Sequence, residues 1–146
     1  MVIVYADDDQ ASRRLVLRAL EMRGHTVFTL DTSNAAQLQQ DALNLLQLTK
    51  AGLKLDVLVL DGHNVLTDSQ GRAFLDVTPL GLLNWLYQNE LGRDCLLILY
   101  SNDNVMVQQA NQQKLVNFRA TICKVGEGGG LQGLLASLDS IAETVA

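Results

Sequence analysis

The sequence predicts an α/β protein in which one domain, residues 1–146, is built on a doubly wound, five-stranded parallel sheet. Short apolar segments alternate with longer amphipathic segments along the chain, in the order βαβαβαβαβα. Several short segments are apolar throughout, as expected of strands that are buried on both faces of a parallel sheet. The composition, 48% hydrophobic and 18% charged with one proline, is typical of a globular chain with a sizeable core.

The first half of the chain is expected to form strands at 2–6, 25–30 and 56–60 and helices at 11–23 and 34–50. The strand segments are rich in β-branched and aliphatic residues, whereas the helical segments place leucine and alanine on one face. Gly24 is expected to end the first helix.

The second half is expected to contain a long polar loop at 62–78, helices at 79–91, 103–116 and 131–141, and strands at 95–100 and 119–124. Pro79 suits the first turn of a helix, because proline lacks the amide hydrogen that an internal turn needs. The pattern at 103–116 is the weakest of the helical ones. Several glycines between 126 and 130 indicate a loop before the last helix.

Composition and charge exclude several classes of function. The formal net charge is −5 and the pI is near 4.8, which disfavours a nucleic-acid-binding surface. The arginines at 13, 14, 18 and 23 are interpreted as a solvated helix face, with a partner-docking face as the alternative. No apolar run is long enough to span a membrane, and the start lacks the basic region of a secretory signal, so we expect a cytoplasmic protein. Cys95 and Cys123 lie in apolar runs and are expected to be buried thiols.

Polar side chains with related chemistry follow four of the predicted strands. Asp7, Asp8 and Asp9 follow the first strand and Asp61 follows the third, while Ser101 follows the fourth and Lys124 ends the fifth. Because ligands of such sheets bind at the carboxyl ends of the strands, these groups are expected to share one site. Clustered carboxylates repel one another, and Mg²⁺ would relieve that repulsion with the oxygen ligands it prefers. An aspartate can also accept a phosphoryl group covalently.

Each of these residues also has a simpler interpretation. Aspartates that follow strands often cap helices, and Asp9 is expected to cap the first helix. Ser101 alone would be an ordinary turn or cap residue, and Lys124 alone a solvated strand end. The combination on the ends of four different strands favours the shared site.

The chain resembles a response-regulator receiver domain, the phosphoacceptor of two-component signalling, over nearly all of its length. The segments that carry the resemblance are VIVYADDDQASRRLV, DVLVLDG, LLILYSN and TICK. The resemblance implies a flavodoxin-like (βα)5 fold and a protein that is not an enzyme in the usual sense. It also implies phosphorylation by a histidine kinase or a phosphotransfer protein, and action on a downstream protein target.

The resemblance assigns a role to each site residue. Asp61 would be the phosphoacceptor, Ser101 would contact the phosphoryl group and Lys124 would pair with it. Mg²⁺ would be bound directly by Asp8, through water by Asp7, by Asp61, and by the backbone carbonyl of His63.

The sequence departs from the family pattern at three positions. Val125 replaces the usual proline after the lysine, Thr121 replaces the usual aromatic switch residue, and Gln10 replaces the proline after the acidic cluster. Thr121, Val125 and the long loop after Asp61 favour, as an alternative, an atypical receiver that binds partners without phosphorylation. A third hypothesis is a Mg²⁺-dependent phosphohydrolase with Asp7 and Asp9 as its acids and the 62–78 loop as its cap.

Overall fold

The computed structural model describes residues 1–61, 64–67, 73–77, 79–101, 118–123 and 130–145. These residues form a parallel sheet with helices packed against it, which confirms the predicted α/β class. The main sheet has the order β2-β1-β3-β6-β7, and its neighbouring strands all run parallel. Its strands are β1 Val2–Asp7, β2 Thr26–Asp31, β3 Val57–Leu60, β6 Leu96–Ser101 and β7 Phe118–Cys123.

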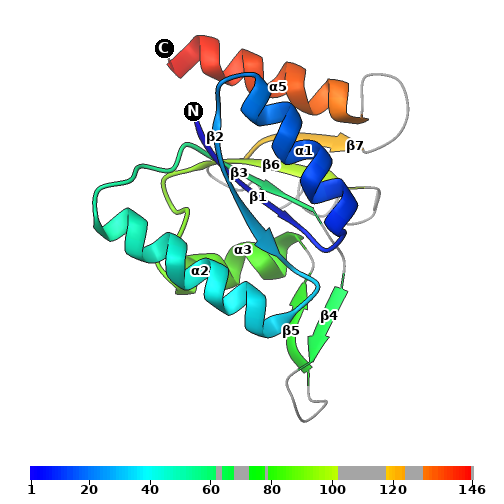
Figure 1. The fold of residues 1–146 in the computed structure, drawn as a ribbon, viewed down its shortest axis with the longest axis vertical. Coiled ribbons are helices and arrows are strands. Elements are labelled where there is room, and N and C mark those ends of the chain that lie inside the picture. The colour runs from blue at the N-terminus through cyan, green and yellow to red at the C-terminus, as the bar shows by residue number, and fades with distance from the viewer. Residues whose placement is uncertain (62–63, 68–72, 78, 102–117, 124–129, 146) are drawn as a thin grey trace.

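The helices are α1 Gln10–Met22, α2 Ala35–Lys50, α3 Pro79–Gln88 and α5 Gly130–Val145. In Figure 1, α1 and α5 lie together on one side of the main sheet, and α2 and α3 lie on the other. None of the helices in the described ranges is long and apolar enough to cross a membrane. The helix predicted at 103–116 falls outside the described residues.

The central strands are buried on both faces. Ile3 and Tyr5 of β1 belong to a buried cluster with residues of α1 and α5, such as Leu20 and Leu138. Val4 and Ala6, which alternate with them along β1, belong to a second buried cluster on the other face of the sheet, where α2 and α3 pack. Side chains of a strand alternate between its two faces, and here both faces meet helices. This explains why the β1 and β3 segments are apolar throughout.

Main-chain and side-chain hydrogen bonds hold β1 and β3 together at both ends. At the amino end, the N–H of Val2 donates to the Asp56 carboxylate at 2.8 Å. At the carboxyl end, the N–H of Asp61 donates to the carbonyl oxygen of Ala6 at 2.9 Å. The two strands therefore finish side by side, with Asp7 and Asp61 at the same edge of the sheet.

Helix α1 ends where the sequence predicts. Gly24 has φ +86°, in the left-handed region that glycine adopts without strain. Its N–H donates to the carbonyl oxygen of Glu21 at 2.9 Å, and the N–H of His25 donates to that of Leu20 at 3.2 Å. These bonds satisfy carbonyl groups of the last turn and lead the chain directly into β2.

The prediction that residues 62–78 form a long loop is wrong. β4 Asn64–Thr67 and β5 Ala73–Val77 pair as an antiparallel two-stranded sheet, separate from the main sheet. Figure 1 shows this hairpin beside the start of α3, directed away from the main sheet. The sequence contains a signal for it, because the apolar residues of NVLT and AFLDV flank the glycine-containing segment DSQGR. The polar residues interspersed among them obscured two short strands.

Candidate functional site

Three carboxylates meet at the carboxyl edge of the main sheet. One oxygen of each of Asp7, Asp8 and Asp61 lies within 4.8 Å of the others. Asp7 is completely buried, Asp61 is 5% exposed and Asp8 is partly exposed. The pairing of β1 with β3 produces this arrangement, since Ala6 lies opposite Leu60 and the next residues are Asp7 and Asp61. The structure thus brings together the three aspartates that the sequence placed in one site.

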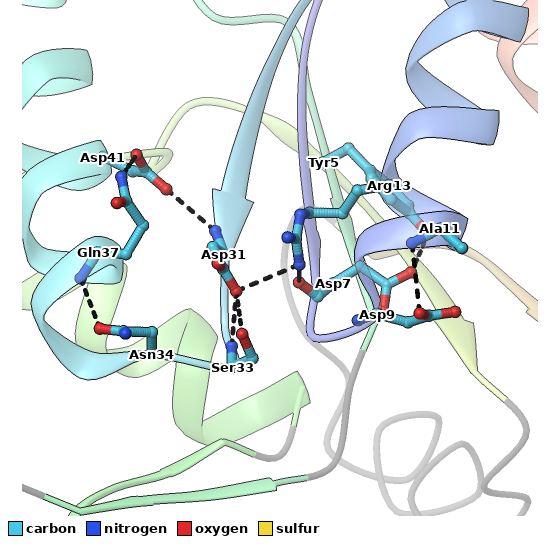
Figure 2. Close-up of polar contacts among 10 residues, drawn as sticks. All are labelled: Tyr5, Asp7, Asp9, Ala11, Arg13, Asp31, Ser33, Asn34, Gln37 and Asp41. Carbon is cyan, nitrogen blue, oxygen red and sulfur yellow. Dashed lines mark hydrogen bonds and ion pairs between the residues drawn. The ribbon is translucent and has the colours of Figure 1, made fainter.

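Both carboxylate oxygens of Asp7 accept hydrogen bonds, as Figure 2 shows. The hydroxyl of Tyr5 donates to Oδ2 at 2.6 Å, and the N–H of Asp9 donates to Oδ1 at 3.0 Å. Burial raises the pKa of Tyr5 well above its usual value, and the hydrogen bond to Asp7 and the charge of Asp61 raise it further. The phenol therefore stays protonated and donates to Asp7. We refer to the three carboxylates of Asp7, Asp8 and Asp61 as the acidic group.

The main-chain carbonyl of Asp7 is also held in place. Nη1 of Arg13 donates to it at 2.8 Å, and the N–H of Thr32 donates to it at 3.2 Å. The same Arg13 nitrogen lies 3.2 Å from the carboxylate of Asp31, at the end of β2 (Figure 2). The interpretation of the α1 arginines as a solvated face is therefore wrong for Arg13, whose side chain is only 13% exposed. Arg14 and Arg18 are exposed, as that interpretation requires.

Asp9 caps helix α1, as predicted from the sequence. Its backbone is extended, and its carboxylate accepts from the N–H of Ala11 at 3.3 Å and from the hydroxyl of Ser12 at 2.7 Å. An N-cap carboxylate in this position satisfies donors that the first helical turn leaves without an intrahelical partner. Asp9 is therefore engaged with the helix, while Asp7 and Asp8 join Asp61.

The remaining predicted site residues lie wholly or partly outside the described residues. Ser101 ends β6 opposite Cys123 of β7, so its backbone lies at the same edge of the sheet as Asp61. Its side chain falls outside the description, as does that of Thr121 in β7. His63, Lys124 and Val125 fall outside it entirely.

Sequence reasoning did not find Tyr5 and Arg13. Tyr5 reads as one more core residue of β1, although residues two apart on a strand share a face, and this places it next to Asp7. Arg13 reads as part of the polar face of an amphipathic helix. Only the packing of α1 against the ends of β1 and β2 shows that it points into the sheet edge.

The acidic group has the donor set of a divalent-cation site. It offers only carboxylate oxygens, which suit hard cations such as Mg²⁺. Two of its three carboxylates are buried next to each other, and a cation between them would offset their mutual repulsion. The partly exposed Asp8 leaves the group accessible to the waters that Mg²⁺ usually keeps.

No protein-family model matches the chain, and no curated protein matches its sequence. Its fold is that of response-regulator receiver domains. The receiver domain of a Francisella response regulator is 14% identical, with a TM-score of 0.61 over 99% of this chain and 98% of that one. A Thermotoga maritima response regulator in complex with Mg²⁺-BeF is 15% identical, with a TM-score of 0.54 over 94% and 97%. A Burkholderia pseudomallei response regulator with a phosphorylated aspartic acid, a calcium ion and citrate is 18% identical, with a TM-score of 0.56 over 99% and 69%.

Proposed function

We propose that this chain is a response-regulator receiver that is phosphorylated on Asp61 in the presence of Mg²⁺ and signals through protein–protein interaction. One observation carries the proposal: Asp7, Asp8 and Asp61 converge within 4.8 Å at the carboxyl edge of a receiver-like sheet. In parallel α/β sheets this edge is the usual place for ligands.

In the proposed site, Asp8 and Asp61 would hold Mg²⁺ directly, Asp7 would hold it through water, and the backbone carbonyl of His63 would be a further ligand. When bound there, Mg²⁺ would offset the negative charge of the phosphoryl group and of the carboxylates. The Mg²⁺-BeF complex of the Thermotoga protein and the phosphorylated aspartic acid of the Burkholderia protein support this chemistry, because both proteins share the fold.

In the proposed reaction, a carboxylate oxygen of Asp61 attacks the phosphorus of a phosphohistidine donor. The new P–O bond forms as the P–N bond breaks, and the imidazole leaves and takes up a proton. The product is an acyl phosphate on Asp61. Ser101 donates a hydrogen bond to the new phosphoryl group, and Lys124 pairs with its charge.

The donor in this proposal is a histidine kinase or a phosphotransfer protein, and the output is binding to a downstream protein. The proposal includes a single receiver domain over residues 1–146 that acts in the cytoplasm and is not an enzyme in the usual sense. The net charge of −5 accords with a protein partner rather than nucleic acid.

The test is incubation of the whole chain with a small phosphodonor and Mg²⁺, followed by intact mass measurement. We expect a gain of one phosphoryl group that is lost in Asp61→Asn and when the metal is chelated. Asp31→Asn is the matched control, because Asp31 lies opposite Asp7 at the end of the neighbouring strand but outside the acidic group. A mass gain that persists in Asp61→Asn would refute the assignment.

A second candidate is an interaction module that does not use phosphorylation. It is favoured by the β4–β5 hairpin, which begins at Asn64, three positions after Asp61 in the sequence, and by the unusual residues Thr121 and Val125. Under this alternative no phosphodonor changes the mass of the chain. The phosphohydrolase hypothesis is less favoured, since it needs Asp9 as a second acid and Asp9 caps α1.

A further inference from the structure

We infer that Tyr5 is a positioning residue that holds Asp7 in a fixed orientation, and that its hydroxyl thereby favours Mg²⁺ over Ca²⁺ at the acidic group. The inference rests on the metal site of the proposed function. It adds a residue that is two positions before Asp7 and that does not itself bind the metal.

The side chain of Tyr5 cannot move freely. Its side chain is completely buried among the residues that α1 and α5 pack against the sheet, including Val16, Leu20 and Leu134. A ring enclosed in a close-packed interior keeps one orientation. The Tyr5 hydroxyl is therefore held at a fixed position next to the Asp7 carboxylate.

The hydroxyl of Tyr5 restrains the carboxylate of Asp7. At 2.6 Å, its hydrogen bond to Oδ2 is shorter than the 3.0 Å hydrogen bond that the N–H of Asp9 donates to Oδ1. Two donors, one on each oxygen, define the plane of the carboxylate. The carbonyl oxygen of Asp7 is held as well, by Arg13 and Thr32, so neither main chain nor side chain of Asp7 is left to rotate.

The hydroxyl of Tyr5 is an uncharged hydrogen-bond donor. A phenol donates a hydrogen bond without bringing a positive charge, whereas a lysine or arginine in the same place would repel the cation electrostatically. Tyr5 therefore restrains Asp7 without adding a positive charge next to the metal. Hydrogen-bonding partners of ligating carboxylates contribute to metal affinity in this manner.

Mg²⁺ and Ca²⁺ differ in the ligand geometry that they require. Mg²⁺ requires nearly ideal octahedral geometry at short distances, whereas Ca²⁺ accepts irregular arrangements and bidentate carboxylates. A fixed Asp7 carboxylate would hold its bridging water at one position of an octahedral shell, which suits Mg²⁺, whereas Ca²⁺ tolerates a carboxylate that turns. Removing the Tyr5 hydroxyl should therefore weaken Mg²⁺ binding more than Ca²⁺ binding.

The experiment is calorimetric titration of the whole chain with Mg²⁺ alone and with Ca²⁺ alone. Tyr5→Phe keeps the ring and removes the hydroxyl, and we expect it to lower the Mg²⁺ affinity about tenfold or more, with a smaller loss for Ca²⁺. Tyr87→Phe is the matched control, since Tyr87 is a partly buried tyrosine of α3, on the opposite face of the sheet. It should leave both affinities unchanged.

Equal losses for the two ions in Tyr5→Phe, or no loss, would overturn the role of Tyr5 while leaving the metal site intact. A wild-type chain that binds neither ion would overturn the metal site and the role of Tyr5 together. If Tyr5→Phe does not fold, the ultraviolet absorbance of tyrosine is followed during titration of a Tyr87→Phe/Tyr100→Phe chain with Mg²⁺, in which Tyr5 is the one tyrosine left. We expect a change with the same midpoint as the calorimetry, and its absence would contradict the inference.

Discussion

The guanidinium of Arg13 lies 3.2 Å from the carboxylate of Asp31 and donates at 2.8 Å to the main-chain oxygen of Asp7. One side chain of α1 thus joins the ends of β1 and β2. Replacement by methionine keeps much of the volume and removes both interactions, so Arg13→Met should lower the free energy of unfolding by about 1–2 kcal/mol. Urea denaturation measures this loss.

The control for Arg13 is Arg14→Met, because Arg14 is exposed on the same helix. It should change the free energy of unfolding by less than about 0.5 kcal/mol. Equal effects of the two substitutions would show that the contacts of Arg13 contribute nothing specific to stability.

Asp9 should be important for α1 and dispensable for metal binding. Asp9→Ala removes the acceptor for Ala11 and Ser12 and should cost about 1 kcal/mol of stability, while Asp9→Ser should keep most of it. Thermal unfolding measures the cost, and calorimetry with Mg²⁺ should give the wild-type affinity for both variants. A strong loss of Mg²⁺ affinity in Asp9→Ser would instead place Asp9 among the ligands.

Gly92 should tolerate a side chain poorly. A Cβ there would lie 2.5 Å from Cδ1 of Leu58, a buried residue of the central strand β3, and φ is already +79°. Gly92→Ala should therefore cost about 2–3 kcal/mol, combining left-handed strain with overpacking. Chemical denaturation provides the measurement.

Gly24→Ala is the matched control for Gly92, because φ is +86° and no atom lies within 4 Å of the added Cβ. It should show only the backbone strain, about 1–2 kcal/mol. If Gly24→Ala proved as costly as Gly92→Ala, the contact with Leu58 would be unimportant.

Cys95 should make stability fall at alkaline pH. Burial raises the pKa of its thiol from 9.0 to about 12, and Sγ donates to the carbonyl oxygen of Leu55. Above pH 9 the thiol ionises in the unfolded chain but stays protonated in the folded one, so the free energy of unfolding falls until about pH 12. The slope from this group is at most about 1.4 kcal/mol per pH unit.

The slope is measured by chemical denaturation at a series of pH values, in comparison with Cys95→Ala. The variant should be less stable at neutral pH, because it leaves a cavity, yet it should lose less stability above pH 9. Parallel curves for the two proteins would mean that the thiol ionises equally in the folded and unfolded chains.

The fold and the acidic group were predictable for the same reason. β1 and β3 are buried on both faces, so their segments are apolar throughout and easily recognised. Once the strands are taken as parallel, topology alone brings Asp7, Asp8 and Asp61 to one edge.

Other features depend on contacts that periodicity does not encode. The hydroxyl of Tyr5 is a minor part of a side chain that reads as apolar, and Arg13 reads as a residue of the solvent-facing side of α1. The strands β4 and β5 are short and contain polar residues, so the sequence of this region favours a loop over two strands. The hairpin register is set by pairing between the two strands, which neither segment shows alone.

The aspartates at the two ends of β3 also determine how that strand is aligned. Its sequence, VLVL, repeats every two residues, so a slide by two positions would still place a valine at one of the two valine sites and a leucine at one of the two leucine sites. Such a slide would carry Asp56 or Asp61 into the dry interior of the sheet, at a large desolvation cost. The two charged side chains therefore disfavour shifted registers, and the repetitive strand pairs in one register.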